Sequence, residues 1–433
     1  MLIFLSSFAY LCIAVMGYYR RDRFLMNPIT VMFGIWAILI PLSSIYAYEV
    51  PPPSDKCLII IFVGLMGYLL GNVFSNSKCS FAVNGHIMNQ PETEYGFNYK
   101  ILYVLYIISF VYLLSSAYVA ITLMMKGYGL DYIRELVTAE GTNEIRSSYL
   151  SILIKNFIAT PTVYLALAIL PIDMIMGKRD KVLLFLTIVM TVCWVISSGG
   201  RSVILWMVLY FFVFYLFAKS KSFRIKVSKR IKRLAIIGGV LLLLLLLYTT
   251  YARKGFNVDL LRQLFIYYIA PVKHFDKYVE LVDTRYTDFY GYGGASFYGF
   301  IYPVLFIGRV LSGRDEYSDF WVTVRELSFN KLEHTTWLGG NIHMNAFVTI
   351  FYQPYIDGRF VGVFVLCLFF GWMCGYTYKR AYIFRNIKYI LLYLLFIQKI
   401  ADSMVRFYFT QPAQAICLIF ALFAVVKKGK DMK

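Results

Sequence analysis

The stretch "VLLFLTIVMTVCWVISSGGRSVILWMVLYFFVFYLFA" (182–218) decides the fold class of this chain. Two apolar arms of about 15 residues flank the polar turn from Ile196 to Ser202. As a helix, each arm rises roughly 23 Å, slightly less than a hydrocarbon core of about 30 Å. Lys181 and Lys219 stand at the far ends, and lysine gathers on the cytoplasmic side of a membrane. The sequence therefore predicts a membrane hairpin whose tip lies near the outer headgroups.

The same apolar character extends along the whole chain. It has 433 residues, of which 60% are hydrophobic and 15% are charged. A soluble fold could not bury that much apolar surface. Apolar runs long enough to cross a bilayer, about 20 residues as a helix, recur from residue 2 to residue 426. We therefore expect an all-α polytopic membrane protein in which residues 1–433 form a single membrane domain.

The basic residues predict the orientation of the spans. The net charge of +19 would suit nucleic acid, but the basic residues collect in short segments between apolar runs. Nucleic acid is therefore not an expected partner, and the positive-inside rule places these segments in the cytoplasm. Eleven spans result, with the N-terminus outside and the C-terminus inside, and one missed span would make twelve. The predicted spans lie near residues 2–18, 29–47, 57–74, 101–124, 150–176, 182–196, 203–218, 234–251, 359–377, 389–407 and 411–426.

Two outer segments are large. Residues 126–149 form one outer loop, and residues 252–358 form a large periplasmic loop with short helices. The second loop has nearly balanced charge, as a folded loop that holds a site would. Within it, residues 258–282 predict an interfacial helix pair broken at Pro271. Residues 297–311 are apolar but too short for a full span.

The tip of the hairpin has the residues of an anion site. A helix start presents unpaired backbone N–H groups and the positive end of its dipole. Gly199 and Gly200 let a ligand approach that backbone, and Arg201 adds a forked cation. The depth suits the phosphate or diphosphate of a lipid better than a soluble anion. An ordinary helix N-cap, with an arginine that reaches the headgroups, explains the same residues.

Two more arginines lie at similar depth. Arg253 follows the eighth predicted span, and Arg406 lies toward the outer end of the tenth. Lys399 and Asp402 share one face with Arg406 and can neutralise each other, which leaves Arg406 in surplus. Since few cations are expected near the outer interface, Arg201, Arg253 and Arg406 together indicate a cationic site. A structural ion pair with a snorkelling arginine is the alternative.

A polar cluster before the chain re-enters the membrane provides a candidate base. His343 is the first candidate, because imidazole can accept a proton near neutral pH. His334, Glu333 and Asp357 are alternatives, and ordinary surface hydrogen bonding would explain each of them. Upstream, residues 288–303 hold seven Phe and Tyr among glycines, which suits either sugar stacking or an interfacial aromatic belt. Neither a metal-ligand spacing nor a Walker loop is present, so we expect no metal and no cofactor.

This pattern resembles the bacterial O-antigen polymerases, the Wzy family of oligosaccharide repeat-unit polymerases. "SGGRS" (198–202) is similar to the family's S-G-x-R turn between adjacent spans. A long outer loop precedes the last few spans, as in the family. Its end, "GGNIHMNAFVTIFYQPYIDGRFVG" (339–362), resembles the family's G-x-N and D-F-G-x-x-G close. The chain departs from the pattern after Asp357, where Gly358 and Arg359 stand in place of F-G, although Gly362 is in place.

The resemblance implies a metal-independent glycosyltransferase of the GT-C type in the bacterial inner membrane, with its active site facing the periplasm. Its donor and acceptor would both be undecaprenyl-diphosphate-linked glycans, and membrane lipid and a chain-length regulator protein are further expected partners. Arg201, Arg253 and Arg406 would hold the departing diphosphate, because arginine stays charged and binds phosphate oxygens in pairs. A residue near His343 would deprotonate the attacking hydroxyl.

Two other functions remain open. An O-antigen ligase would use the same arginines but would transfer the glycan to lipid A core. A lipid-linked glycan flippase or another transporter would be expected to have repeated halves, broken helices at the midplane and little outer domain.

Overall fold

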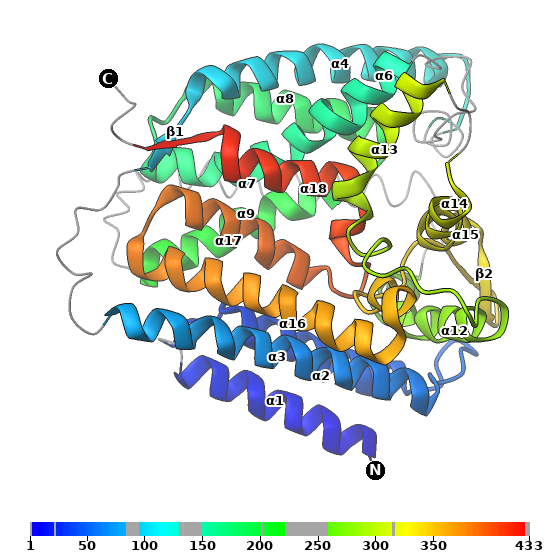
Figure 1. The fold of residues 1–433 in the computed structure, drawn as a ribbon. Helices are drawn as coiled ribbons and strands as arrows, with labels where there is room; N and C mark the ends of the chain where they lie inside the picture. The colour runs from blue at the N-terminus through cyan, green and yellow to red at the C-terminus, as the bar shows by residue number, and fades with distance from the viewer. Residues whose placement is uncertain are drawn as a thin grey trace. The chain divides into compact units, whose positions relative to one another are not determined.

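The computed structural model shows a mostly helical chain (Figure 1). It divides into two compact units. The first unit comprises residues 1–92 and 259–415, and the second comprises residues 93–258 and 416–433. The structure describes residues 2–20, 23–83, 95–129, 133, 149–200, 202–220, 259–313 and 317–428.

Long apolar helices confirm that this is an all-α fold with the character of a membrane protein. Six helices within the described residues are long and apolar enough to cross a membrane: Asp55–Ser75, Tyr99–Met125, Leu150–Met176, Lys181–Ser198, Ser202–Ser220 and Tyr352–Phe384. Four shorter apolar helices are Ser6–Tyr19, Pro28–Ser43, Tyr298–Ser312 and Pro412–Ala424. The predicted span at 234–251 lies outside the described residues. The full count of eleven to twelve spans and the GT-C arrangement stay predictions.

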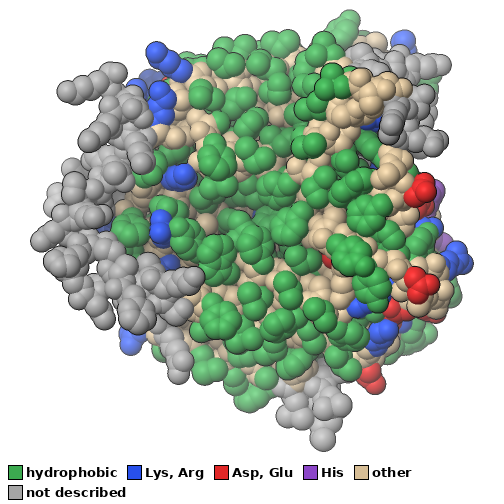
Figure 2. Space-filling view, in the orientation of Figure 1, with side chains coloured by type: hydrophobic (Ala, Val, Ile, Leu, Met, Phe, Trp, Pro, Cys, Tyr) green, Lys and Arg blue, Asp and Glu red, His purple; other side chains and the backbone are tan. Residues whose placement is uncertain are grey.

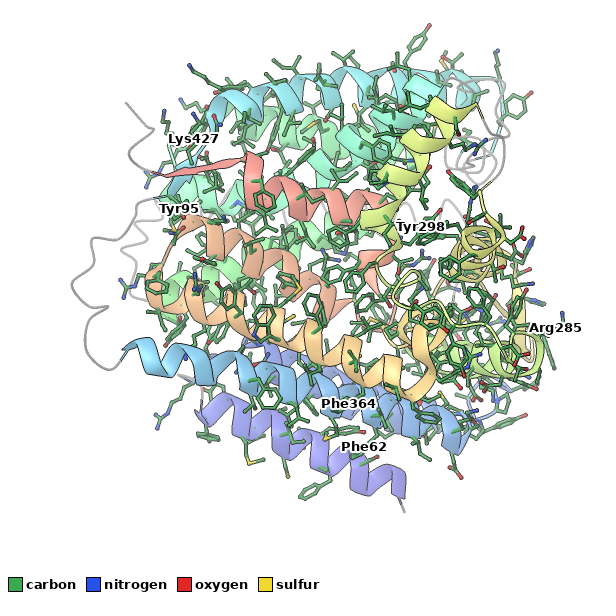
Figure 3. All side chains as sticks on the ribbon, viewed as in Figure 1. Phe62, Tyr95, Arg285, Tyr298, Phe364 and Lys427 are labelled. Carbon is green, nitrogen blue, oxygen red and sulfur yellow. The ribbon has the colours of Figure 1, made fainter. Side chains whose placement is uncertain are left out.

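The body of the first unit is a set of packed helices: α1 (Leu2–Arg20), α2 (Pro28–Ser43), α3 (Asp55–Val83), α16 (Tyr352–Phe384) and α17 (Ile387–Ala401). The most extensive contact between two helices joins α3 to α16 (Figure 1). A side chain at Gly71 would collide with the carbonyl group of Leu368, and one at Gly371 would collide with that of Tyr68. Small residues at this spacing let membrane helices approach closely. Figure 3 labels Phe62 on α3 and Phe364 on α16, which belong to this helix pair.

Helix α16 is kinked near its start. Gly358 has φ −169° and ψ 30°, and Arg359 has φ 52° and ψ −135°, so neither residue is helical. The kink separates a first segment at 352–357 from the long apolar part of the helix. The large outer loop predicted at 252–358 therefore ends in a short helical segment of its own.

The predicted tenth span at 389–407 is wrong in its extent. Helix α17 ends at Ala401, and residues 402–411 form turns and the 3-10 helix η5 (Tyr408–Thr410) before α18 (Pro412–Ile419) begins. The carbonyl groups of Ser403 and Val405 accept hydrogen bonds from Ile350 and Val348, at 2.7 and 2.8 Å. Because a neighbouring segment satisfies this backbone, the helix does not need to continue.

The two ends of the first unit's helices differ in charge. The C-terminal end of α16 and the start of α17 have the basic residues Lys379, Arg380, Arg385 and Lys388. Figure 2 shows hydrophobic side chains over the visible face of the helices and both acidic and basic side chains at the opposite end, where α12 lies. This separation matches the chemistry of a bilayer, with apolar faces between two polar ends.

The second stretch of the first unit, from residue 259, begins with one continuous helix, made of α11 (Leu260–Leu264), the π-helix η3 (Phe265–Ile269) and α12 (Ala270–Arg285). The predicted break at Pro271 is therefore wrong. The N–H group of Ala270 donates to the carbonyl group of Phe265, which makes a wide π turn just before the proline. This turn adds one residue and so accommodates a ring that has no N–H group.

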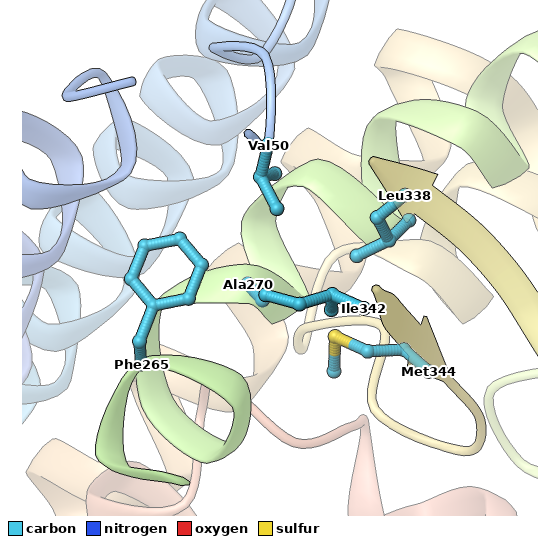
Figure 4. Close-up of a cluster of buried hydrophobic side chains, with 6 residues drawn as sticks. All are labelled: Val50, Phe265, Ala270, Leu338, Ile342 and Met344. Atoms are coloured by element: carbon cyan, nitrogen blue, oxygen red, sulfur yellow. The ribbon is translucent and has the colours of Figure 1, made fainter. Parts of the chain in front are cut away.

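The described elements that follow, before α16, are α13 (Tyr298–Ser312), α14 (Asp319–Arg325), η4 (Glu326–Asn330), α15 (Lys331–Glu333), β2 (Thr336–Gly339) and β3 (Ile342–Met344). Strands β2 and β3 pair as an antiparallel hairpin. A buried apolar cluster fixes this hairpin on the α11–α12 helix (Figure 4). The cluster consists of Val50, Phe265, Ala270, Leu338, Ile342 and Met344.

The second unit is built from β1 (Tyr95–Phe97), α4 (Tyr99–Met125), α6 (Tyr149–Ile154), η2 (Lys155–Ala159), α7 (Thr160–Met176), α8 (Lys181–Ser198), α9 (Ser202–Ser220), η6 (Phe420–Ala424) and β4 (Val426–Lys428). Helix α4 packs along α8, α7 packs against α9, and β1 pairs with β4. Helices α8 and α9 are the two arms of the hairpin predicted from residues 182–218.

Candidate functional site

The tip of the α8–α9 hairpin is closed by its own hydrogen bonds. Gly199 has a left-handed backbone (φ 57°), and its N–H group donates to Val195 O at 2.9 Å. The N–H group of Gly200 donates to Ser198 Oγ at 3.1 Å, and Ser198 Oγ donates to Trp194 O at 2.7 Å. A left-handed glycine that ends a helix in this way is a common C-cap. These bonds form a C-cap of α8, whereas the predicted N-cap of the second arm falls at Arg201, outside the described residues, and stays a prediction.

Of the three predicted arginines, the structure describes Arg406. Arg201 and Arg253 lie outside the described residues. Arg406 is described, and its Nη2 donates to Ala346 O at 2.9 Å while its backbone forms a bridge with Thr349. Because α17 ends before residue 402, Arg406 does not share a helix face with Lys399 and Asp402, contrary to the prediction from their spacing.

Lys399 and Asp402 have partners on either side of the helix end. Lys399 Nζ donates to Gln414 Oε1 at 2.9 Å, and its side chain is buried. Asp402 accepts hydrogen bonds from Gln398 Nε2 at 2.7 Å and from Tyr408 OH at 3.3 Å. These bonds tie the irregular residues 402–411 to the end of α17 and the start of α18.

His343 lies on an exposed face of the β2–β3 hairpin. It is the cross-strand partner of Trp337, whose indole Nε1 donates to Gly340 O at 2.8 Å. His334, just after α15, is also exposed. Neither histidine lines the groove described below, so the assignment of His343 as the base stays a prediction.

A third histidine is buried and has one partner for its ring. His274 Nδ1 lies 2.7 Å from Phe347 O, and the ring packs edge-on against Tyr278. Its Nε2 has no hydrogen-bond partner among the described residues. Burial lowers the pKa of His274 to about 4, although the bond to Phe347 opposes this shift. The histidine is therefore neutral at physiological pH and is enclosed by protein, so it is poorly placed to act as a base.

An open groove in the first unit, with a volume of about 680 Å³, is a candidate site. The residues that line it belong to α13 and the long part of α16, here called its walls, to the glycine-rich loop at 291–294, called its floor, and to α14, called its rim. The lining is mainly apolar. The residues that form it are Gly291, Tyr292, Gly293, Gly294, Phe297, Ile301, Phe320, Trp321, Asp357, Gly358, Val361, Gly362, Val365 and Leu366.

Asp357 is the carboxylate among these lining residues, and it binds the glycine-rich loop. Its Oδ1 accepts the N–H group of Ala295 at 2.9 Å, and its Oδ2 accepts that of Ser296 at 2.8 Å. The N–H group of Tyr292 donates to the backbone carbonyl of Asp357 at 3.1 Å. Only 4% of Asp357 is exposed. A carboxylate with both oxygens occupied and so little solvent contact is poorly placed to take a proton from a substrate.

Arg359 makes equally specific contacts next to the groove. Its Nη2 donates to Tyr286 O at 2.7 Å and to Thr287 O at 3.2 Å. The guanidinium group also lies over the rings of Tyr290 and Tyr355, with centroids at 5.1 and 5.5 Å. A guanidinium group can lie over an aromatic ring while its N–H groups donate hydrogen bonds, and a lysine ammonium group cannot reproduce this combination.

Asp283 connects Arg359 to two other helices. Its Oδ2 lies 2.6 Å from Lys56 Nζ, and its Oδ1 accepts the hydroxyl of Tyr355 at 2.8 Å. Arg359 Nε is 3.8 Å from the same Oδ1. This charged cluster lies at the start of α3 and α16, where the outer loops meet the helical body.

Sequence reasoning named the glycine- and aromatic-rich stretch and Asp357 but did not connect them. The stretch at 288–303 provides the floor of the groove and the start of α13, and Asp357 holds it in place. No local pattern could show this, because the two partners are about 60 residues apart. The positive φ of Arg359 could not be predicted from the sequence either, since arginine rarely adopts this backbone conformation.

Comparisons of the chain with protein-family models, with characterised proteins and with solved structures find no match. Among the described residues, no group of three or more His, Cys, Asp or Glu is arranged to hold a metal ion. The interpretation of the groove therefore depends on its own residues and their chemistry.

Proposed function

We propose that this chain is a membrane glycosyltransferase that polymerises undecaprenyl-diphosphate-linked oligosaccharide repeat units into O-antigen or a related surface polysaccharide at the periplasmic face. The observation that supports this function best is the groove. It combines an apolar wall on membrane-type helices with a floor of glycine backbone and a rim of aromatic rings. A lipid-linked glycan has the same sequence of parts: a hydrocarbon chain, a polar head and sugars.

Each part of the groove suits one part of that substrate. Val361 and Val365 on α16 are 72% and 52% exposed, so this wall would contact hydrocarbon. A polyprenyl chain would replace lipid chains there without exposing apolar surface to water. The glycines of the floor let a polar head approach the backbone closely. Phe320 and Trp321 offer ring faces on which a sugar can stack.

The proposed reaction is a glycosyl transfer between two lipid-linked glycans. A hydroxyl oxygen of the incoming repeat unit bonds to the anomeric carbon of the growing chain. The bond from that carbon to the lipid diphosphate breaks, and its electron pair leaves with the diphosphate. The hydroxyl proton passes to a base, for which His343 is the sequence-based candidate. Arg201, Arg253 and Arg406 remain the candidates for neutralising the charge on the leaving diphosphate.

Filling the groove tests this function. A side chain at Gly358 would meet no atom within 4 Å, and its φ of −169° lies outside the left-handed region. We expect Gly358→Leu to fold, to obstruct the groove and to reduce long chains at least about tenfold, a loss of roughly 1.4 kcal/mol in transition-state stabilisation. A deletion strain carrying the variant would be compared with wild type on a silver-stained lipopolysaccharide gel. The polymerase signature is lipid A core bearing one repeat unit.

A matched control separates obstruction from the added leucine itself. Gly308 on α13 also has no atom within 4 Å of a new side chain, but it does not line the groove, so Gly308→Leu should give a normal ladder. Bare core with long chains stranded on the lipid carrier would identify a ligase instead. Bare core with single repeats trapped inside would identify a flippase. A full ladder from well-expressed Gly358→Leu would remove the groove from the reaction.

A further inference from the structure

The kink of α16 holds both ends of the loop that forms the groove floor. We propose that Asp357 and Arg359 act together as a clasp that fixes residues 286–296 in the shape that makes the groove. Both would be positioning residues, which act on the substrate through the loop rather than by contact with the reacting atoms. Their effect on synthesis depends on the proposed function, whereas the clasp itself depends only on the contacts within the first unit.

Arg359 holds the beginning of the loop. Its guanidinium group donates to the carbonyl groups of Tyr286 and Thr287, which lie where α12 has just ended. The carbonyl group of Tyr286 also accepts the N–H group of Phe289 at 3.1 Å, so the charged donor of Arg359 reinforces the turn that follows α12. The ring of Tyr290 lies under the same guanidinium group. The direction in which the chain leaves α12 is thereby fixed relative to α16.

Asp357 holds the other end of the loop. The N–H groups of Ala295 and Ser296 point into its carboxylate, one at each oxygen. Between the two ends, the N–H group of Gly291 donates to Ile356 O at 3.1 Å. A side chain at Gly291 would collide with the carboxylate of Asp357. The loop is therefore drawn onto the kink as closely as its backbone allows.

The backbone of Arg359 is the second, independent observation. Its φ of 52° and ψ of −135° fall where glycine is favoured and other residues are strained. A kink alone would be easier to form with glycine at this position. The side chain of Arg359 offsets the strain because its bonds to Tyr286 and Thr287 form only when the kink is present. Strain of this kind is kept in proteins mainly where the geometry serves a function.

The loop is also supported from behind, so the clasp does not act alone. Thr410 Oγ1 donates to Ala295 O at 3.0 Å. Gly299, in the first turn of α13, lies against the carbonyl groups of Phe409 and Gln411. Removing one side of the clasp should therefore loosen the loop without unfolding the unit.

Hydrogen exchange of the full-length protein in detergent tests the clasp directly. In Asp357→Ala, the amides of Ala295 and Ser296 lose charge-assisted acceptors, and we expect their exchange to be about 10- to 100-fold faster. In Arg359→Lys, the planar fork is lost, and faster exchange should centre on the start of the loop. If Asp357→Ala does not accumulate, Asp357→Asn replaces it, because its amide group can accept only one of the two N–H groups.

Asp259 provides a matched control. Its Oδ1 accepts the N–H groups of Leu261 and Arg262 at the start of α11, at 2.9 and 3.1 Å. Asp259→Ala should speed exchange only at its own helix start and should leave the loop unchanged. Wild-type exchange at 291–296 in the folded Asp357 variants would overturn the clasp.

Steady-state kinetics with lipid-linked repeat units separates positioning from catalysis. Loosening the loop should raise KM more than it lowers kcat and should leave the pH profile of kcat unchanged. A lower kcat with an altered pH profile in Asp357→Asn would make it a catalytic residue and overturn the positioning role. Faster loop exchange with a normal ladder of chains would support the clasp and count against the proposed function alone.

Discussion

Two glycine-rich turns of this chain look alike in sequence and are stabilised in different ways. The turn "SSGGRS" (197–202) is closed by partners within four residues, such as Gly199 to Val195. The loop "GYGGAS" (291–296) is held by Asp357, about 60 residues away. The first turn is therefore a local property of its helix, whereas the second exists only when the first unit has folded. The hydrogen-bond partners of a glycine-rich segment, rather than its sequence, therefore indicate its role.

The largest difference between the two turns should come from adding one methyl group to each. Gly291→Ala would push a methyl group into the buried Asp357 carboxylate, so we expect a loss of about 3 to 5 kcal/mol from overpacking and a broken charged hydrogen bond. Gly199→Ala would place an alanine in the left-handed region, which costs about 1 kcal/mol. Thermal unfolding in detergent measures both. Equal losses would end the distinction between a local and a long-range turn.

Acid should affect the two turns differently. The pKa of His274 in the folded state is about 4, below its ordinary value of 6.5, so the unfolded chain takes the proton first. This histidine lowers stability progressively as pH falls from about 6.5 to about 4, by roughly 3 kcal/mol in total, and adds no further loss below that. Because His274 belongs to α12, exchange at 291–296 should rise over this range before exchange at 197–202 does.

The variant His274→Gln provides the comparison, since its amide can still donate to Phe347 O but does not titrate in this range. Its stability should lack the wild-type decline between pH 6.5 and pH 4. An identical decline in both proteins would assign the acid sensitivity to other groups.

The smallest expected effect sharpens the interpretation of the first turn. Ser198→Ala removes the hydroxyl that joins Gly200 N to Trp194 O, and we expect a loss of about 1 kcal/mol with little change in glycan synthesis. Melting temperature and chain-length distribution would be measured on the same preparation. A stable Ser198→Ala protein that makes few chains would show instead that the turn binds a ligand, as its sequence first suggested.

Apolar runs predicted most of the helices well because a bilayer leaves the backbone few alternatives. In hydrocarbon every N–H and C=O group must be satisfied internally, so a long apolar run becomes a helix. The arms predicted at 182–196 and 203–218 agree with α8 and α9 within a few residues. The same argument failed at 402–411, where residues 348–350 satisfy the backbone that a helix would have satisfied.

The candidate site was less predictable than the helices because its partners are distant in sequence. The aromatic and glycine-rich stretch at 288–303 attracted attention for its composition, and Asp357 for its place in the resemblance. Their contact depends on the kink at Gly358 and Arg359, which no spacing rule predicts. One usable signal was overlooked: glycines four residues apart, at 67 and 71 on α3 and at 371 and 375 on α16, mark a close helix pair.

The glycine contact between α3 and α16 joins two helices that are synthesised at different times. Gly371 is synthesised 300 residues after Gly71, and all of residues 93–258 are synthesised between them. At about 5 to 20 residues per second, α3 has left the ribosome roughly 15 to 60 seconds before its partner. During that interval lipid, or an insertion factor, must cover the glycine face of α3. The first unit can therefore complete its folding only late in synthesis. The groove forms only as the last quarter of the chain is inserted.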